Sequence, residues 1–530
     1  MEKISKNASR MGIAVLLSRL LGLLREKIFA HLFGAGFFSD AFIVAYRIPN
    51  LFRDLFAEGA LSTAFVSVFS KEKLKEEKHE LALRMGALLS FVLLLLCSLL
   101  ALLAPQIVEF FASHFKSDPL KFDLTVQLTR PLSFFLYFAS MAALSMGILN
   151  SLGYYFLPAL GSAAFNVVNI VLGGGAAYWA IHSQKNMTLA IGLFAGAYLL
   201  GGFAQWFVQW KLLRKESFQP SLGFFKIFSW SYLKKACFDT RIKRVFKIML
   251  PSILTVGAMQ VNVLVNTIFA TGLDEGSVSW LSYAFRLVHF PMGVFGVSIF
   301  MAALPQLSRQ TKDKREFEKI LHESLNLSLI LAVASSMGLF LMGENIVSLI
   351  FEGGKFTRQD AHSTALALSA YAVGLLAFNW SKICTSVFFA LEKIWIPSLL
   401  AVLGVISNFI FSYFLSQKYQ HAGIALSVSL TASLFVFFMF LFIRRMGYCV
   451  FNKKLFQNLI LSFSGGALMW GATTYFQMKD QLFLLRDQQG VFIYAIGVFA
   501  VIALLGIVFF LPLLAFSEDA RILVKKILRK

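Results

Sequence analysis

Charged residues interrupt an apolar stretch near the start of the chain, between Ser18 and Glu58. The stretch is long enough for two membrane-crossing helices. A charge at the middle of a bilayer costs roughly 2.5 to 3.5 kcal/mol on insertion scales, so these side chains are expected to face protein or water. The arginines among them can pair with carboxylates of the same stretch or bind an anionic ligand. The charged residues are Arg19, Arg25, Glu26, Lys27, Asp40, Arg47, Arg53, Asp54 and Glu58.

Helical spacing gathers these residues into one polar stripe on each predicted helix. The first stripe contains Ser18, Gly22, Arg25 and Glu26. The second contains Asp40, Arg47, Asn50, Asp54 and Glu58. Two polar stripes on adjacent helices predict a water-filled cavity between them. Pro49 lies within the second stripe and is expected to bend its helix toward that cavity, because proline removes a backbone donor.

The whole composition predicts an all-α, polytopic membrane protein. Of the 530 residues, 58% are hydrophobic and 15% charged, and apolar runs of spanning length recur from end to end. We expect about fourteen transmembrane helices. The 49 Lys and Arg outnumber the 28 Asp and Glu, but they gather in alternate loops rather than in a nucleic-acid-binding pattern. The positive-inside rule therefore predicts that both termini are cytoplasmic.

The second half of the chain repeats features of the first at one constant offset. Ala45-Tyr46-Arg47 recurs as Ala284-Phe285-Arg286, Pro158 as Pro397, and Asn169 as Asn408. This predicts two six-helix pseudo-symmetric lobes around a shared central cavity, followed by a C-terminal helix pair. The predicted limits are 1–213 for the N-lobe, 214–247 for a cytoplasmic amphipathic linker, 248–445 for the C-lobe, and 446–530 for helices 13 and 14 with a basic tail.

Signatures of an enzyme or a metalloprotein are missing from the sequence. Gly353-Gly354-Lys355 is followed by Phe356 and lacks the upstream glycine of a phosphate-binding loop, and there is no HExxH motif. The four cysteines are scattered, without a CxxC pair, and are expected to be buried thiols. Gly192 and Gly196 have a spacing that favours close helix packing. We expect no catalytic residue, no cofactor and no metal.

An ordered series of motifs runs along nearly the whole chain. They are SRLLGLLRE (Ser18 to Glu26), FGAG with SDAF (Phe33 to Phe42), RIPNLFRDLFAEGALSTAF (Arg47 to Phe65), GILN (Gly147 to Asn150) with Pro158-Ala159, GSVSWLSYAFRLVHFPMGVFGVS (Gly276 to Ser298), FEGGKFTRQD with YAVGL (Phe351 to Leu375), and Ala390-Leu391 before Pro397. With these motifs the chain resembles the MurJ (MviN) lipid II flippases of the MOP transporter superfamily.

The resemblance implies a function in bacterial cell-wall synthesis. Such a flippase carries lipid II, the undecaprenyl-diphosphate-linked peptidoglycan precursor, across the cytoplasmic (inner) membrane by alternating access. Its partners would be this lipid and the surrounding membrane lipids, without nucleic acid. The implied substrate-binding residues are Arg19, Arg25, Arg53, Arg286, Asn50 and Ser279, and the implied cavity or gating carboxylates are Asp40 and Glu58. Arginine suits this cargo because its planar fork pairs bidentately with phosphate oxygens.

Some residues depart from the family pattern and leave alternatives open. Phe285 and His289 stand where family members often carry acids, which puts any proton role there in question. Another polyprenyl-linked oligosaccharide, or a drug, is the alternative cargo, although a cationic drug would need acidic cavity residues. A third hypothesis is a membrane scaffold that transports nothing and whose charged residues only hold helices together. Helices 13 and 14 are expected to form a groove for the polyprenyl tail.

Overall fold

The structure, a computed structural model, describes residues 2–56, 60–72, 74–154, 156–216, 218, 229–517 and 521. Within these ranges the chain forms helices and no strand. Eight of the helices are long and apolar enough to cross a membrane, or nine if a pair bent by 42° at Gly374 counts as one span. The predicted helical membrane fold is confirmed, and the count of about fourteen spans stays a prediction.

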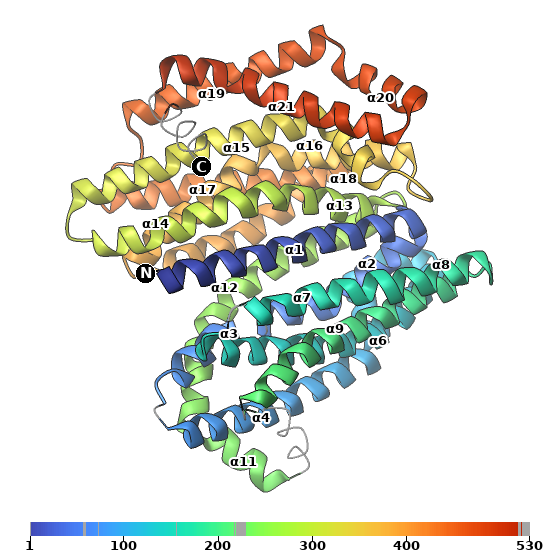
Figure 1. The fold of residues 1–530 in the computed structure, drawn as a ribbon, viewed down its shortest axis with the longest axis vertical. Helices are drawn as coiled ribbons and strands as arrows, with labels where there is room; N and C mark the ends of the chain where they lie inside the picture. The colour runs from blue at the N-terminus through green and yellow to red at the C-terminus, as the bar shows by residue number, and fades with distance from the viewer. Residues whose placement is uncertain are drawn as a thin grey trace. The chain divides into compact units, whose positions relative to one another are not determined.

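The helices form two compact units, which we call unit 1 and unit 2. Unit 1 comprises Met1–Gln260 with Gly354–Phe356, and unit 2 comprises Val261–Gly353 with Thr357–Lys530. The division falls inside one helix, α12 (Thr240–Thr271). Within each unit the long helices run side by side (Figure 1). The predicted lobe limits and the shared cavity stay predictions.

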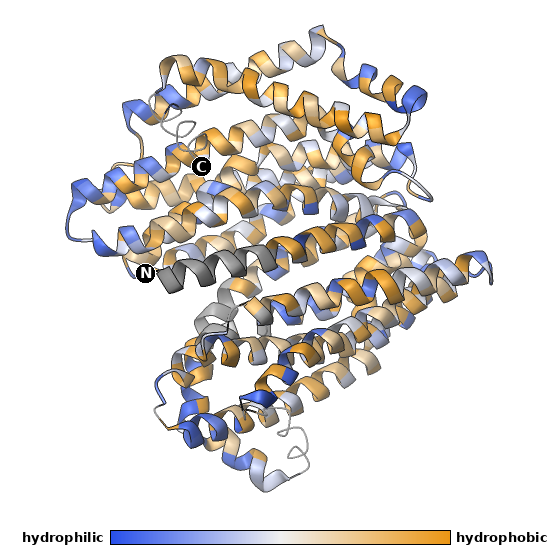
Figure 2. Ribbon diagram, in the orientation of Figure 1, coloured by the Kyte–Doolittle hydropathy of each residue, from blue (hydrophilic) through white to orange (hydrophobic). Residues whose placement is uncertain are grey.

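Unit 1 is built around one long helix, α6, which packs against α2, α3, α4 and α9. Apolar residues predominate along these helices, and hydrophilic residues collect at helix ends and connections (Figure 2). The helices of unit 1 before α12 are α1 (Glu2–Phe33), α2 (Phe37–Phe56), α3 (Ala60–Phe69), α4 (Lys75–Leu102), α5 (Ala104–Phe111), η1 (Ser113–Ser117), α6 (Pro119–Ser151), α7 (Phe156–Val168), η2 (Asn169–Gly174), α8 (Gly175–His182), α9 (Met187–Lys215) and α11 (Trp230–Phe238).

Local sequence explains where the helices of unit 1 begin. Asp118 caps α6 by accepting a hydrogen bond from the backbone nitrogen of Lys121, and Pro119 occupies the first turn, where its missing N–H costs nothing. Asn186 caps α9 in the same way through the backbone nitrogen of Leu189. These caps fix the register with which α6 and α9 present their faces to the core.

The predicted linker contains an amphipathic helix. In α11, Leu233 and Ala236 are buried while Trp230 and Phe238 are exposed, at 73% and 65% of their accessible surface. Such a helix, with lysines beside exposed aromatic rings, is typical of a membrane interface. Residues 219–228, which the sequence also assigns to this linker, lie outside the described part of the chain.

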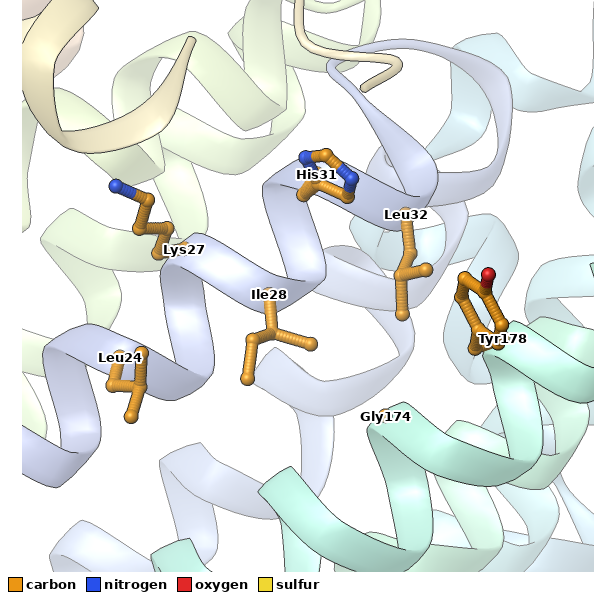
Figure 3. A pocket seen from close by; sticks show the side chains of 7 residues that line it. All are labelled: Leu24, Lys27, Ile28, His31, Leu32, Gly174 and Tyr178. Carbon is orange, nitrogen blue, oxygen red and sulfur yellow. The ribbon is translucent and has the colours of Figure 1, made fainter. Parts of the chain in front are cut away.

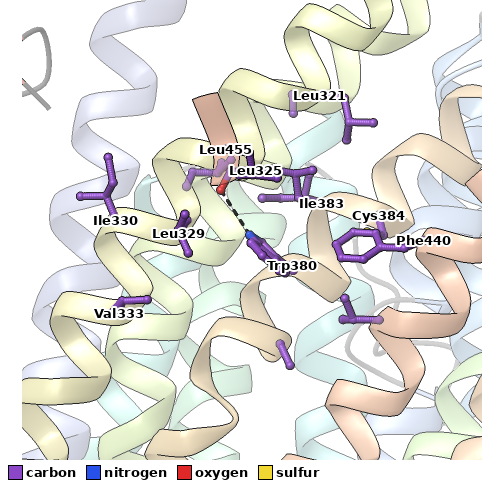
Figure 4. Close-up of a cluster of buried hydrophobic side chains, with 14 of the residues drawn as sticks. Leu321, Leu325, Leu329, Ile330, Val333, Trp380, Ile383, Cys384, Phe440 and Leu455 are labelled. Carbon is purple, nitrogen blue, oxygen red and sulfur yellow. Dashed lines mark hydrogen bonds between the residues drawn. The ribbon is translucent and has the colours of Figure 1, made fainter. Parts of the chain in front are cut away.

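Unit 2 is organised around α15, which packs against α14, α16, α17, α19 and α21. Its buried cluster includes Trp380, whose indole nitrogen donates to the Leu325 carbonyl at 3.2 Å (Figure 4). The helices after α12 are α13 (Ser277–Pro291), η3 (Met292–Gly296), α14 (Val297–Arg309), α15 (Lys314–Phe351), α16 (Arg358–Val373), α17 (Leu375–Ala390), α18 (Trp395–Arg445), α19 (Lys453–Tyr475), α20 (Met478–Gln489) and α21 (Val491–Phe516).

The C-terminal helices are held to α15 at two levels. Asn458 of α19 donates to Asn326 at 3.0 Å within the core. Directly after the end of α15, Glu352 forms an ion pair with Arg486 of α20. At the close approach of α19 and α21, a Cβ on Gly465 would lie 2.5 Å from the Phe509 carbonyl, so only glycine fits there. These contacts make the helix pair an integral part of unit 2.

Two packing predictions were wrong in part. Added Cβ atoms on Gly192 and Gly196 would meet nothing within 4 Å, whereas one on Gly201, farther along α9, would lie 2.5 Å from the Asn169 side chain. The close packing of α9 therefore depends on a later glycine, Gly201, which lies four positions after the small residue Ala197. All four cysteines are free; Cys97 and Cys384 are buried as expected, but Cys237 and Cys449 are exposed.

Candidate functional site

Arg25 is a buried cation inside unit 1. Only 8% of its surface is exposed, and its guanidinium lies 5.2 Å from the ring centroids of both Phe165 and Tyr198. Its Nη2 atom donates to Glu26 Oε1 at 2.7 Å, although neighbouring residues on a helix ordinarily point apart. One carboxylate and two aromatic faces thus offset the cost of burying this charge.

The hydrogen-bonding capacity of Arg25 is not exhausted by these partners. Its buried Nε atom has no hydrogen-bond partner among the described residues. A guanidinium offers five N–H donors, and a phosphate can accept two of them in parallel. Arg25 can therefore take an anionic ligand by exchanging Glu26 for it or by adding the ligand beside it.

A second polar group gathers at the end of α2 around a carboxylate, Asp54. Its Oδ1 atom accepts from Arg53 at 3.1 Å, and its Oδ2 atom accepts from Asn50 at 3.3 Å and from Gln260 of α12 at 2.9 Å. Arg53 and Asp54 each keep 23% of their side-chain surface exposed. The helical stripe predicted that Asn50 and Asp54 would meet, but Gln260 could not be found from sequence because it is far away along the chain. Glu58, also assigned to this stripe, lies outside the described residues.

Arg19 is exposed on α1 and makes no hydrogen bond or ion pair with another described residue. The turn that carries it is anchored, because the side chain of Asn166 in α7 donates to the Ser18 carbonyl at 2.9 Å. Arg19 is thus an exposed cation next to an anchored turn of backbone, accessible to a ligand.

Asp40 lies at the opposite end of α2 from Asp54, roughly 20 Å away along the helix. It is 2% exposed and pairs with Lys121 Nζ at 3.1 Å, and this ammonium also lies 4.6 Å from the ring centroid of Phe115. Sequence reasoning missed Lys121 because no local pattern links the first turn of α6 to α2. The structure brings Asp40 to this lysine and separates it from Arg53 at the other end of α2, while its gating role stays a prediction.

The predicted residues of unit 2 lie on α13. Arg286 is exposed, and so is His289 one turn further on, whose ring centroid lies 4.3 Å from that of Phe285. Ser279 is fully buried. Directly after Pro291, the last residue of α13, the chain forms the π-helical turn η3, a kind of turn that is frequent at functional sites. Arg286 is therefore accessible to a ligand, while a binding role for Ser279 stays a prediction.

An apolar pocket of about 290 Å³ lies beside the second half of α1. Figure 3 shows Lys27 and His31 pointing together toward one side, while Ile28 and Leu32 point toward the other. The lining residues are Leu24, Lys27, Ile28, His31, Leu32, Gly174 and Tyr178. The pocket contains none of the predicted arginines, so it is not where the sequence places the anion.

A further charged cluster joins α4 to the start of α12. Asp239 accepts hydrogen bonds from Arg84 at 2.7 Å and from Arg241 at 2.8 Å. Burial alone would raise the pKa of Asp239, but the hydrogen bonds from Arg241 and Arg84 outweigh it and hold this pKa at about 2. These two arginines are engaged in holding the fold of unit 1.

Comparisons with known proteins identify the family. The model of the lipid II flippase MurJ family matches residues 29–487. This chain belongs to the lipid II flippase MurJ family. A probable lipid II flippase MurJ of Buchnera aphidicola subsp. Acyrthosiphon pisum is 32% identical over 457 residues, covering 85% of this chain and 84% of the relative. The lipid II flippase MurJ of Burkholderia cenocepacia is 32% identical over 438 residues, 82% of each chain.

Solved structures agree on the fold. A structure titled lipid II flippase MurJ, inward closed conformation, matches with a TM-score of 0.71 at 24% identity, covering 94% of this chain and 97% of its own. An inward-facing multidrug resistance MATE transporter of the MOP superfamily matches with a TM-score of 0.63 at 16% identity, covering 83% of this chain and 98% of its own. The predicted MurJ family is confirmed, and the match to the MATE transporter shows a shared fold.

Proposed function

We propose that this protein translocates lipid II from the inner to the outer leaflet of the bacterial cytoplasmic membrane by alternating access. The family membership supports the cargo. The structural observation that carries the mechanism is Arg25, a cation buried inside a membrane-spanning unit and balanced by a single carboxylate. Burying this cation costs desolvation free energy, and ionisable residues inside membrane spans are usually functional. A ligand-binding role is therefore favoured over a role in packing alone.

The diphosphate would be bound by exchange of partners. In this conformation Arg25 pairs with Glu26 and Arg53 with Asp54. When the lipid arrives, its phosphate oxygens replace the carboxylates, and the aromatic faces of Phe165 and Tyr198 keep the guanidinium of Arg25 in place. A carrier needs this reversibility, because a cation without a resting partner would hold the diphosphate too tightly to release it.

The remaining predicted residues supply charge and orientation around this step. Arg19 and Arg286 are exposed cations that would meet the diphosphate on entry or exit. Asn50 would orient the ligand beside Arg53, and Ser279 would reach it only after α13 moves. Asp40, which pairs with Lys121, and Glu58 would act as gating carboxylates. We also propose that both termini are cytoplasmic.

The polyprenyl tail would lie along the C-terminal helices. Their outer surface is apolar and open, with Phe492 and Phe499 of α21 exposed at 79% and 66% and Phe463 and Trp470 of α19 at 58% and 60%. A photoreactive group placed on α21 should crosslink to the polyprenyl chain of bound lipid II. Crosslinks to bulk phospholipid alone would contradict this part of the proposal.

Native mass spectrometry of the purified protein tests the cargo. We expect lipid II to co-purify with the wild type and to be lost from Arg25→Met. The matched control is Arg244→Met, which removes the same charge from an exposed position at the start of α12. A different polyprenyl-linked oligosaccharide in the spectrum would favour the alternative cargo, and retention of lipid II by Arg25→Met would contradict the role of that arginine.

A further inference from the structure

Unit 2 contains a lysine inside a membrane span without an acidic partner. Lys382 lies in the middle of α17, is half-buried, and makes no hydrogen bond or ion pair with any other described residue. Ionisable residues within membrane spans are rare, face protein or water, and usually carry a function. None of the described carboxylates of unit 2 pairs with this lysine, so it can still bind an anion.

The partly covered edge of α17 around Lys382 is more polar than an ordinary lipid-facing edge. The side of α17 that is not fully covered consists of Phe378, Ser381, Lys382, Thr385 and Phe389, three of which are polar. The Ser381 and Thr385 hydroxyls donate to carbonyls of their own helix at 2.7 Å each. Their hydrogen-bond donors are therefore satisfied, and Lys382 is left as the group on this edge that can attract an anion.

A second unsatisfied group lies one turn away on the same helix. Asn379 is completely buried, and neither Oδ1 nor Nδ2 of its side chain has a hydrogen-bond partner among the described residues. It is pressed against the π-helical turn η3, where a Cβ on Gly296 would lie 2.3 Å from Asn379 Oδ1. A buried polar atom left unpaired destabilises the folded state, so a native protein that keeps two of them is expected to pair them with a ligand or water.

We propose that Lys382 and Asn379 form a second anion-binding site of unit 2, for a phosphate or carboxylate group of the transported lipid's head group. The inference rests on the proposed function and adds a position to it. Gly296, which contacts Asn379, is ten residues beyond Arg286 along the same span, or about 15 Å. The head group thus meets one cation of unit 2 at Arg286 and another near the middle of α17.

The ammonium supplies the charge, and the carboxamide supplies a directional donor. Residues three apart on a helix lie on adjacent positions of its surface. An anionic group bound at Lys382 Nζ can therefore also accept from Asn379 Nδ2 once the turn η3, which covers that side chain, moves aside. A lysine suits a site that must release its ligand, because its point charge binds without the bidentate geometry of arginine. Two cations of different strength along one unit would let the head group advance in steps.

Protection of Lys382 from an amine-reactive reagent tests the site directly. The protein in phospholipid nanodiscs would be labelled alone, with lipid II, and with undecaprenyl diphosphate, and each lysine quantified by mass spectrometry. We expect Lys382 to react at least fivefold more slowly with lipid II present, while Lys393, exposed beyond α17, is unchanged. Protection by undecaprenyl diphosphate as well assigns the diphosphate, and protection by lipid II alone assigns the peptide carboxylates. Equal labelling of Lys382 in all three samples overturns the proposal.

Transport kinetics separate a binding role from a structural one. Lys382→Met should raise the KM for lipid II about tenfold with little change in kcat, Lys382→Arg should restore it, and the matched control Lys393→Met should have no effect. Asn379→Leu should raise KM while keeping or increasing thermal stability, because it removes two unpaired polar atoms. Unchanged KM and kcat in Lys382→Met would overturn the site even if Arg25→Ala abolishes transport. Full activity of Arg25→Ala would instead count against the proposed function.

Discussion

The buried ion pair between Asp40 and Lys121 offers a measurable test of what holds unit 1 together. The side chains are 2% and 9% exposed, and Lys121 Nζ lies 3.1 Å from Asp40 Oδ2. At an effective dielectric constant near 20, this separation corresponds to roughly 5 kcal/mol of attraction, most of which offsets the desolvation of the two charges. Removing one partner leaves the other charge buried, so we expect Lys121→Met to cost about 3–5 kcal/mol of unfolding free energy.

The double variant Asp40→Asn with Lys121→Met removes both charges and should recover most of that loss. Reversible unfolding in mixed micelles would measure the four proteins of the cycle, with a coupling of at least 2 kcal/mol expected. The exposed pair Lys116–Glu109 is the control, where Lys116→Met should change stability by less than about 1 kcal/mol. An additive cycle, or a Lys121→Met protein as stable as the wild type, would refute the reasoning. A stable double variant that cannot transport would support a gating role for Asp40.

Three further predictions concern separate parts of the molecule. The pKa of Asp239 in the folded protein is about 2, below its ordinary 3.8, so its charged form stabilises the fold. Asp239→Asn should therefore lower the free energy of unfolding by up to about 2 kcal/mol at neutral pH. In a thermal-unfolding series, the difference between variant and wild type should vanish as the pH falls from 4 to 2. Gly201→Ala should cost about 1–3 kcal/mol in chemical unfolding, whereas Gly192→Ala on the same helix should be neutral or stabilising. Transport should slow when valinomycin and potassium collapse the membrane potential at fixed ion gradients. The reason is that a cationic carrier moves charge through the membrane field, which is worth about 2.3 kcal/mol per elementary charge per 100 mV. Undiminished transport or a strict sodium requirement would contradict this prediction.

Local patterns in the sequence predicted the helices and several members of the site. The spacing of Asn50 and Asp54 placed them on one helical face, where they form a hydrogen bond. The cost of burying charge required partners for the arginines, and Arg25 and Arg53 have them in Glu26 and Asp54. These inferences succeed because helical periodicity and desolvation act over a few residues.

Contacts between distant segments could not be predicted in the same way. Lys121 and Asp40 meet because α6 packs against α2, and neither segment contains a signal for the other. Gly201 lies four positions after Ala197, and Gly192 and Gly196 have the same spacing, so spacing alone could not show which glycine packs. Gly201 packs because Phe165 of α7 and Asn169 of η2 lie against it. Contacts of this kind come from tertiary packing, and no local pattern in a single sequence identifies which distant segments will pack together.

Reconstituted transport tests the central claim most directly. Purified protein in liposomes would be supplied with fluorescent lipid II, and the fraction reaching the opposite leaflet would be measured by a membrane-impermeant quencher. We predict that the wild type moves the lipid, that Arg25→Ala does not, that Arg25→Lys moves it partially, and that Arg244→Ala matches the wild type. Transport by Arg25→Ala at the wild-type rate, in folded protein, would contradict the account.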